Sequence, residues 1–449
     1  MQELVKFHPT KRLFIDTLTK DISVRDCIFD LLDNAVDSYV RHKIRERREI
    51  RVEFDKEKFL IYDNCGGISV DHLLNHVFRF GVIDTAVNLP TIGVYGIGLK
   101  RAIFKLGRKI FFKTDDGSDY SCLKIDVDEW VQKSDERLED WNIPLLEHKK
   151  TKLKSGEKPY THIEITNLNE ETKETFTEAF TQRLKKAIQI YYALFIQDNI
   201  DIFINNEIQQ PFEIRVKIRW DSNPASFLDE YNNVEIKIIC WIEYREEEKR
   251  IPKKEKRQGW NVFMNKRLIL HDNVGPETGW TGEQPHLPKF HSIFNDFRGI
   301  VYLISNDPSK LPLNTEKNGF DRENATYIYL LKKMIYVAKP LIQYLERKYD
   351  KQKREVQEHE EKLEDFLQKQ RGDKKPKEIS IDKITRNRNF TPPDTPIIKL
   401  PKTTTISYQK PKEQVTKLKK RFKVRSNAEV GSESFDYCFN SLAEGSDEE

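Results

Sequence analysis

Three polar residues share one face of a predicted helix near the start of the chain. Asp30, Asn34 and Asp37 are separated by four and three positions, so their side chains leave the helix on the same side. Apolar residues recur at helical spacing between Val24 and Tyr39, and Ser23 is placed to cap the helix. A carboxylate and an amide on one face could hold a water molecule and a magnesium ion, because magnesium prefers oxygen ligands. A polar stripe that faces solvent would have the same pattern, so the motif alone leaves both interpretations open.

A second group of residues follows a predicted strand and reads Tyr62-Asp63-Asn64-Cys65-Gly66-Gly67-Ile68. The carboxylate of Asp63 could accept a hydrogen bond from an exocyclic amine, such as that of adenine. Gly67 would let the backbone lie close to a flat ring and adopt a positive φ. A simple hairpin turn uses the same residue types, so this segment is also ambiguous by itself.

The third group is a glycine-rich segment that opens a predicted helix and contains Gly93, Gly96, Gly98, Leu99 and Lys100. Glycines at this spacing expose consecutive backbone N–H groups, and the start of a helix attracts phosphate. Lys100 would add a positive charge. The spacing matches neither a dinucleotide-binding fingerprint nor a Walker loop, and a glycine-rich stretch alone is a weak indication of a phosphate site.

The elements that must position these groups mix helices and strands without a repeating βαβ order. We expect a hairpin over Arg51–Tyr62, helices over Asp71–Phe80 and Leu99–Leu106, strands over Lys109–Lys113, Ser121–Val127 and His162–Asn167, and one long helix over Thr172–Ile196. A second strand-rich block follows, with its clearest strands at Val234–Tyr244, Asn261–Met264 and Gly299–Ile304 and a helix at Tyr327–Leu345. The pattern predicts an α+β fold with a mixed sheet.

Taken together, the three groups resemble the nucleotide-binding motifs of the GHKL ATPases. They occur in the family's order, with 29 residues from Asn34 to Asp63 and 30 from Asp63 to Gly93. This superfamily includes gyrase B, MutL, the ninety-kilodalton heat-shock chaperones, histidine kinases and MORC proteins, which share the α/β sandwich called the Bergerat fold. The resemblance extends over about Ile22 to Leu168, because Thr161–Leu168 is similar to the threonine-bearing strand beneath the adenine. The string Gly93–Lys100 is most similar to the MORC version.

The resemblance implies that the chain binds ATP with magnesium and hydrolyses it. Asn34 would ligate the magnesium ion, Asp63 would accept the adenine amine, and Asp30 would be the general base. The other residues implied to contact the nucleotide are Asp37, Gly67, Ile68, Gly93, Gly96, Gly98, Leu99, Lys100 and Thr161. Two positions depart from the family. Asp30 is one methylene shorter than the usual Glu, so we expect slow hydrolysis, and Cys65 replaces the first glycine after Asp63.

The second block is similar to transducer domains of MORC-like and MutL-like proteins. Asn265-Lys-Arg267-Leu-Ile269 resembles one of their strands, and Leu311–Phe320 resembles the loop that brings a basic residue to the γ-phosphate. Lys317 is our candidate for that residue, and an exposed surface lysine is the alternative. We therefore expect an ATP-binding domain at residues 1–198, a transducer-type α/β domain at 199–345, a charged helix at 346–370 and a disordered tail at 371–449.

Charge is concentrated in the expected tail. Residues 371–425 contain 17 lysine and arginine residues against 5 acidic ones, whereas residues 426–449 contain seven acidic residues and no basic one. The basic part could add salt-sensitive affinity for DNA, although a merely solubilising tail would have the same composition. The five cysteines are scattered, which disfavours a zinc site or a disulfide framework. We found neither a signal peptide nor an apolar run long enough for a bilayer, so we expect a cytoplasmic protein with no membrane partner.

These features favour a nucleotide-dependent homodimer that closes around nucleic acid, in a repair, chromatin-like or antiviral (phage-defence) role. One alternative is a chaperone-like ATPase that acts on a protein client. Another is a regulatory ATP sensor that switches a partner protein. A histidine kinase is not expected because only 33 residues precede Asn34, and a topoisomerase is not expected because no cleavage domain follows.

Overall fold

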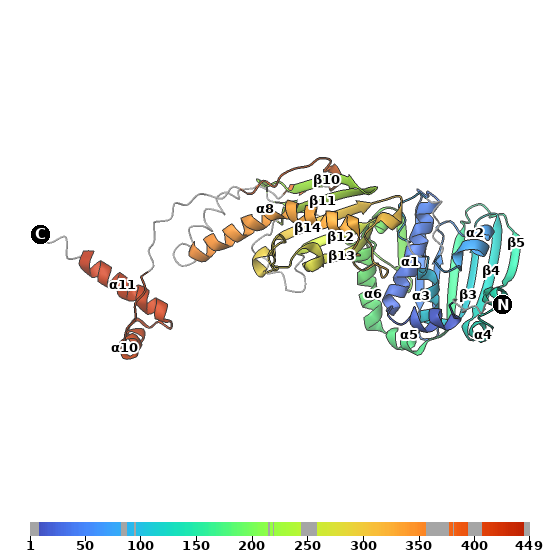
Figure 1. Ribbon diagram of the computed structural model, residues 1–449, viewed down its shortest axis with the longest axis horizontal. Coiled ribbons are helices and arrows are strands. Elements are labelled where there is room, and N and C mark those ends of the chain that lie inside the picture. Colours follow the sequence, from blue (N-terminus) through green and yellow to red (C-terminus); the bar gives the residue numbers. More distant parts are fainter. Residues whose placement is uncertain are drawn as a thin grey trace, which may run out of the picture. The chain divides into compact units, whose positions relative to one another are not determined.

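The computed structural model describes residues 9–81, 88–93, 96–213, 216–218, 220–243, 258–355, 377–379, 381–393 and 406–443. The chain divides into two units, Met1–Asp394 and Thr395–Glu449, and each is described by itself. The first unit contains an eight-stranded and a five-stranded sheet with helices packed on them (Figure 1). This arrangement confirms the predicted α+β class with a large mixed sheet.

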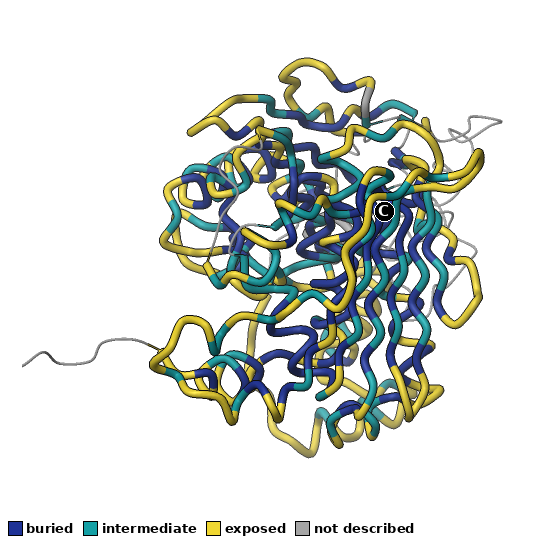
Figure 2. The backbone as a smooth tube through the Cα atoms, turned by 90° about the vertical axis from the view of Figure 1, so that its right-hand side faces the viewer, coloured by how far each residue is buried: buried dark blue, intermediate teal, exposed yellow. Residues whose placement is uncertain are grey.

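The eight-stranded sheet has the order β5-β4-β3-β6-β2-β1-β7-β8. Its strands are β1 (Arg48–Phe54), β2 (Lys58–Asp63), β3 (Gly107–Asp115), β4 (Asp119–Asp126), β5 (Leu145–Lys150), β6 (Tyr160–Leu168), β7 (Ile200–Ile204) and β8 (Glu207–Ile208). Neighbouring strands are antiparallel except for β1 and β7, which run parallel. Burial alternates along β1, β2 and β6, so one face of the sheet is covered and the other is more open (Figure 2).

Helices α1 (Val24–Arg41), α3 (Gly98–Leu106) and α6 (Glu178–Tyr191) pack on the covered face (Figure 1). Ser23 caps α1 as the sequence predicts, since its side chain accepts a hydrogen bond from the Asp26 N–H. Ile28 and Leu32 of α1 are fully buried in one core with Ile50 and Phe59 of the β1–β2 hairpin. Burial of the apolar side of α1 therefore orients the helix, so its polar residues lie on the opposite side.

The long helix predicted over Thr172–Ile196 is wrong in one respect, because the chain forms three helices there. These are α5 (Glu170–Thr175), α6 and α7 (Ala193–Gln197). Thr177 is extended, with φ −115° and ψ 162°, and its side chain accepts a hydrogen bond from the Phe180 N–H to cap α6. The interruption lets Phe176 turn into the core, where its ring lies 4.4 Å from that of Phe54. The packing of Phe176 in the core therefore outweighs the helical periodicity of the sequence, which favours one continuous helix.

The five-stranded sheet has the order β10-β11-β14-β12-β13. Its strands are β10 (Ala225–Tyr231), β11 (Val234–Ile242), β12 (Gly259–Met264), β13 (Arg267–Asn273) and β14 (Phe297–Ile304). The long helix α8 (Ala325–Glu355) packs on it, and Leu330 and Leu341 of α8 share a core with Ile236 and Val301. The three strands predicted for this block correspond to β11, β12 and β14.

Shorter elements connect these layers. They are α2 (Val70–His72), α4 (Val127–Gln132), the π-helical turns Leu13–Thr17 and Leu73–Val77, and the 3-10 turns Leu138–Trp141, Pro276–Thr278, Ser292–Phe294, Pro308–Lys310 and Ile381–Lys383. The helix predicted over Asp71–Phe80 corresponds to α2 and the π-helical turn that follows it. Strands β7 and β8 lie beyond residue 198 yet belong to the first sheet, so that sheet extends into the range expected for the second domain.

Part of the segment expected to be disordered has regular structure. β15 (Lys377–Ile379) pairs with β9 (Val216–Ile218), and Arg388 forms a bridge with Ser226 of β10. Ile384 is buried, which explains how a segment without apolar periodicity is held against the second sheet. The prediction of disorder is therefore wrong for residues 377–379 and 381–393. The charged helix expected at 346–370 begins within α8, and residues 356–370 lie outside the described residues.

Within the second unit the described residues form α10 (Lys412–Phe422) and α11 (Asn427–Ala443), two helices that the sequence pattern did not predict. Val430 of α11 is buried, whereas the lysines and arginines of α10 are largely exposed. The basic charge predicted for the tail is thus partly carried by a helix. Among the described residues, no helix is long and apolar enough to cross a membrane.

Candidate nucleotide-binding site

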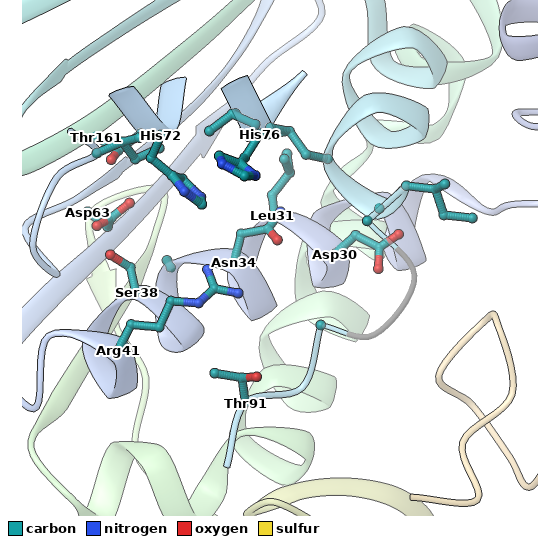
Figure 3. A pocket seen from close by; sticks show the side chains of 18 of the residues that line it. Asp30, Leu31, Asn34, Ser38, Arg41, Asp63, His72, His76, Thr91 and Thr161 are labelled. Carbon is teal, nitrogen blue, oxygen red and sulfur yellow. The ribbon is translucent and has the colours of Figure 1, made fainter. Parts of the chain in front are cut away.

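A cavity of about 810 Å³ lies along α1, between the ends of β2 and β6, the start of α3 and the loop that contains Lys317. All but one of the predicted site residues line it, namely Asp30, Asn34, Asp63, Gly67, Ile68, Gly93, Gly96, Gly98, Leu99, Lys100, Thr161 and Lys317. Asp63 and Thr161 lie on one side of Asn34, and Asp30 lies on the other (Figure 3). The cavity therefore has two chemically different ends, which are joined along α1.

Asp63 provides the acceptor at the first end. One carboxylate oxygen accepts the Cys65 N–H at 2.9 Å, and the side chain lines the cavity. Burial raises the pKa of Asp63 to about 7, and the Cys65 N–H counteracts only part of that rise. A buried carboxylate that can accept further hydrogen bonds favours a ligand with a hydrogen-bond donor, such as an exocyclic amine.

The backbone that follows Asp63 closely approaches the end of β3. Gly67 has φ +67°, and a Cβ there would lie 2.2 Å from the carbonyl oxygen of Asp115. Ile68 donates its N–H to the Thr114 hydroxyl at 2.8 Å, and that hydroxyl lies 3.4 Å from the hydroxyl of Thr161. Thr114 was not predicted as part of the site. Thr114 lies directly opposite Thr161 on the adjacent strand, and only the register of β3 and β6 shows this pairing.

Asn34 lies at the middle of the cavity. Its residue neighbours from Leu31 to Asp33 and from Ala35 to Asp37 are buried, whereas Asn34 is exposed into the cavity. The amide therefore faces the cavity from the polar side of α1 (Figure 3). An amide oxygen in this position is a suitable magnesium ligand when phosphate oxygens complete the shell.

Asp37 does not line the cavity, although it was predicted to contact the nucleotide. Its two carboxylate oxygens accept the N–H groups of Ile92 and Gly93, each at 2.7 Å. Burial raises its pKa, and Arg41 and these two donors oppose that rise. Asp37 therefore anchors the start of the glycine-rich segment. The predicted direct contact with the nucleotide is therefore wrong, and Asp37 instead positions Gly93 beside the cavity.

The start of α3 reaches Asp30 because Gly98 has no side chain. A Cβ at Gly98 would lie 3.1 Å from the Asp30 carboxyl group. Lys100, in the same turn, donates to the carbonyl oxygens of Val77 at 3.2 Å and Arg79 at 2.9 Å. Burial lowers the pKa of Lys100 to about 8. In this structure Lys100 lines the cavity, but its ammonium group is directed at two carbonyls.

Asp30 is held between two cations. Arg101 donates from Nε to Oδ2 at 2.8 Å, and the Lys317 ammonium lies 3.1 Å from Oδ1. Arg101 also donates to the backbone oxygen of Thr315, in the Lys317 loop. The predicted general base is thus close to the predicted phosphate sensor, and both its oxygens are engaged. Sequence spacing alone could not predict that pairing.

Asp33 forms a buried cluster that the sequence pattern does not predict. It accepts hydrogen bonds from Tyr192 at 2.8 Å, from Arg267 at 3.0 Å and from Lys317 at 3.0 Å. Burial would raise the pKa of Asp33, but Lys317 and Arg267 together hold it below its ordinary value. Burial likewise opposes the charge of Lys317, and Asp33 and Asp30 outweigh it and raise its pKa. Each charge is therefore stable only because its partners are present.

The segment Asn265–Ile269, which resembles transducer domains, contacts the first block at two points, on helix α1 and on the loop that contains Thr91. Arg267 reaches Asp33, and its guanidinium lies 4.5 Å from the ring of Tyr192. Asn265 donates to the carbonyl oxygens of Thr91, at 2.6 Å, and Ser305. The second block thus holds both α1 and the loop that leads into the glycine-rich segment.

Residues 22–159 match the model of a known family, described as histidine kinase-, DNA gyrase B-, and HSP90-like ATPase. These residues form a GHKL-type ATPase domain. The matched range contains Asp30, Asn34, Asp63 and the glycine-rich segment, and it ends before Thr161 and Lys317. No curated protein matches the chain at a significant level. The GHKL domain supports binding and hydrolysis of ATP, with the acceptor, amide and glycine-rich segment arranged around one cavity.

The GHKL domain offers donors that fit a magnesium ion bound together with phosphate. Among the described residues, no group of three His, Cys, Asp or Glu side chains is placed to hold a metal by itself. A metal here would therefore depend on Asn34 and on oxygens of the nucleotide. Magnesium in nucleotide sites is usually coordinated by few protein ligands, together with phosphate oxygens and water.

Proposed function

We propose that this protein binds magnesium ATP in the cavity along α1, hydrolyses it slowly, and uses it to control a dimeric clamp on nucleic acid. The observation that supports the control step is the position of Lys317, which belongs to the second block and lies within 3.1 Å of Asp30. A cation brought from another part of the fold can respond to the presence of a γ-phosphate.

The residues would divide the work as follows. Asp63 accepts the adenine amine, Asn34 orients the phosphates through magnesium, and Asp30 takes the proton of the attacking water. Magnesium would supply charge neutralisation at the phosphate oxygens. The Lys317 ammonium group would leave Asp30 and bind the γ-phosphate instead. The Asp30 carboxylate would then be available as the general base. Asp33 remains as the second partner of Lys317, so the ammonium group is never left without a negative neighbour.

Slow hydrolysis follows from two properties of Asp30. Its side chain is one methylene shorter than glutamate, and both of its oxygens are engaged by Arg101 and Lys317. A general base must come within hydrogen-bonding distance of its water, so these contacts must be exchanged before each turnover. We expect nucleotide binding to be much faster than hydrolysis.

The basic helix α10 supports the nucleic-acid part of the proposal. Residues 412–425 contain seven lysine and arginine residues and one acidic residue. Clustered cations on one helix bind phosphate backbones without sequence preference, and salt weakens that binding. The test is DNA affinity of the full chain across a salt series, for the wild type and for Lys420→Glu/Arg421→Glu. Lys43→Glu/Lys56→Glu, on exposed residues of the first unit, is the matched control.

We expect the α10 variant to lose DNA affinity at low salt and the control to keep most of it. Molecular mass in solution should rise to that of a dimer with a non-hydrolysable ATP analogue and fall with ADP. A monomer under all conditions would rule out the clamp, and equal DNA binding by both variants would remove α10 from it. Retained ATPase activity that a polypeptide client stimulates would favour the chaperone-like alternative.

A regulatory ATP sensor is a second candidate, which the engagement of Asp30 by two cations favours. In that case the chain would bind ATP and dimerise with almost no turnover. Single-turnover measurements distinguish the two, because a clamp must release phosphate and reopen. A sensor would retain intact ATP for as long as the dimer persists.

A further inference from the structure

Arg41 is a cation in the cavity that none of the predicted site motifs includes. It lies at the last position of α1 and lines the cavity together with Asn34 and Ser38 of the same helix. These three residues are separated by four and three positions, so they form one line along α1. Asp30 stands four residues before Asn34, which places its Cα atom about 16 Å along the helix axis from that of Arg41.

The other lysine and arginine side chains of the cavity wall already have partners. Lys100 donates to two carbonyl oxygens, whereas Arg101 and Lys317 pair with Asp30. Arg41, in contrast, makes no hydrogen bond or ion pair with any residue that the structure describes, and its Nε is buried without a partner. Its charge acts on Asp37 only through space. A buried guanidinium nitrogen without a partner carries a desolvation cost that a ligand could remove.

A second unpartnered nitrogen lines the same part of the cavity. Nδ1 of His76 is buried and, within the described part of the chain, makes no hydrogen bond. The His76 ring stacks on that of His72 at a centroid distance of 5.0 Å, and both rings point into the space beside Arg41 and Asn34 (Figure 3). Donors from two elements thus face one volume, which fits an oxygen-rich ligand group.

The position of Arg41 decides which group that is. Ser38 donates to the Cys65 carbonyl at 3.0 Å, so the turn that carries Asp63 meets α1 one turn before Arg41. Lys317 and Asp30 mark the opposite end of the line. In Figure 3 the Arg41 side chain lies between Asp63 and Asn34, whereas Asp30 lies beyond Asn34. A phosphate close to the sugar would therefore lie nearer to Arg41 than a terminal phosphate would.

We propose that Arg41, assisted by His76, forms a subsite for the phosphate nearest the sugar of a bound nucleotide. The subsite makes the cavity select nucleoside phosphates over free nucleosides, independently of the γ-phosphate. This inference rests on the proposed nucleotide binding and adds to it a residue that sets specificity. An arginine fits the role because its planar fork forms bidentate hydrogen bonds with phosphate oxygens.

The test compares AMP, ADP and adenosine by calorimetry on the full chain, for the wild type and for Arg41→Gln, Arg41→Lys and Arg45→Gln. Arg45 is an exposed arginine outside the cavity wall, so its variant controls for the loss of one charge. We expect Arg41→Gln to weaken AMP and ADP by about tenfold to a hundredfold and adenosine by less than about threefold. Arg41→Lys should fall between, and Arg45→Gln should match the wild type.

Adenosine is the internal control for folding, because it uses the same acceptor and the same helix. An equal loss of adenosine and AMP in Arg41→Gln would overturn the subsite and make Arg41 a structural residue. Unchanged affinity for AMP and ADP would overturn it as well, and a loss confined to ATP would move Arg41 to the γ-phosphate end. A wild-type protein that binds none of the nucleotides would instead contradict the proposed function itself.

Discussion

The ionisation of Asp63 should make recognition of the base depend on pH. Burial raises the pKa of this carboxyl group from its ordinary 3.8 to about 7. An exocyclic amine donates a hydrogen bond, and an ionised carboxylate accepts it more strongly than the neutral acid does. Because the pKa lies above its ordinary value, the free site loses the ionised form as the pH falls through about 7. A carboxyl group with that pKa is about nine-tenths ionised at pH 8 and about one-tenth ionised at pH 6.

Adenosine should therefore bind more weakly at pH 6 than at pH 8, by up to about tenfold if the ionised site alone accepts the amine. Adenosine is the right probe because it carries no phosphate, whose second ionisation lies near pH 6 and would confuse the result. The dissociation constant is measured by calorimetry or by ligand-detected NMR at half-unit steps of pH. The midpoint of the change reports the pKa of Asp63 in the free protein.

Inosine provides the matched comparison, since it carries an oxygen where adenosine carries the amine. A protonated Asp63 can donate to that oxygen, so the affinity for inosine should rise as the pH falls. Opposite slopes for the two nucleosides would separate Asp63 from His72 and His76, which line the same cavity. Flat profiles for both nucleosides, or parallel slopes, would refute the assignment of Asp63 as the base acceptor.

Three further predictions concern turnover and stability. Lys317→Ala should slow ATP turnover at least about tenfold and leave ADP affinity unchanged, so a loss of ADP affinity would contradict the γ-phosphate role. Asp30→Asn should preserve nucleotide binding but reduce turnover about a hundredfold or more; unchanged phosphate release would assign the base elsewhere. Gly67→Ala should destabilise the fold by clearly more than Gly81→Ala, which should cost about 1–2 kcal/mol, as measured by urea unfolding. The two glycines share a φ near +68°, at +67° and +69°, but only at Gly67 would the Cβ meet a backbone oxygen, that of Asp115.

The residues around the cavity could be predicted because local chemistry dictates them. Asn34 is polar among apolar neighbours at helical spacing, and in the fold it is an exposed residue between buried ones on α1. Asp63 and Gly67 lie at the end of a strand, where glycine marks a close approach of the backbone. Each of these features depends on only a few neighbouring residues, so it can be predicted from the local sequence alone.

The partners of these residues could not be predicted, because they lie far apart in the chain. Asp33 and Arg267 are separated by more than two hundred positions, yet they share a hydrogen bond of 3.0 Å. In a helical pattern Asp33 looked like one more polar residue, and only the fold places it against Lys317 and Tyr192. The order of residues 381–393 escaped prediction for the same reason, since Ile384 is buried against strands that come much earlier in the chain.

The parallel pairing of β7 with β1 determines how the nucleotide-binding part can be cut from the chain. A fragment that stops at residue 198 would remove Ile200, Ile202 and Ile204, all fully buried, and leave the edge of β1 open for association with other chains. A fragment that ends at 213 would keep the sheet, but it would strip Arg267 and Lys317 from Asp33. Such a fragment would contain a buried carboxylate without a counter-charge, so its behaviour would misrepresent the intact protein even where its strands are complete.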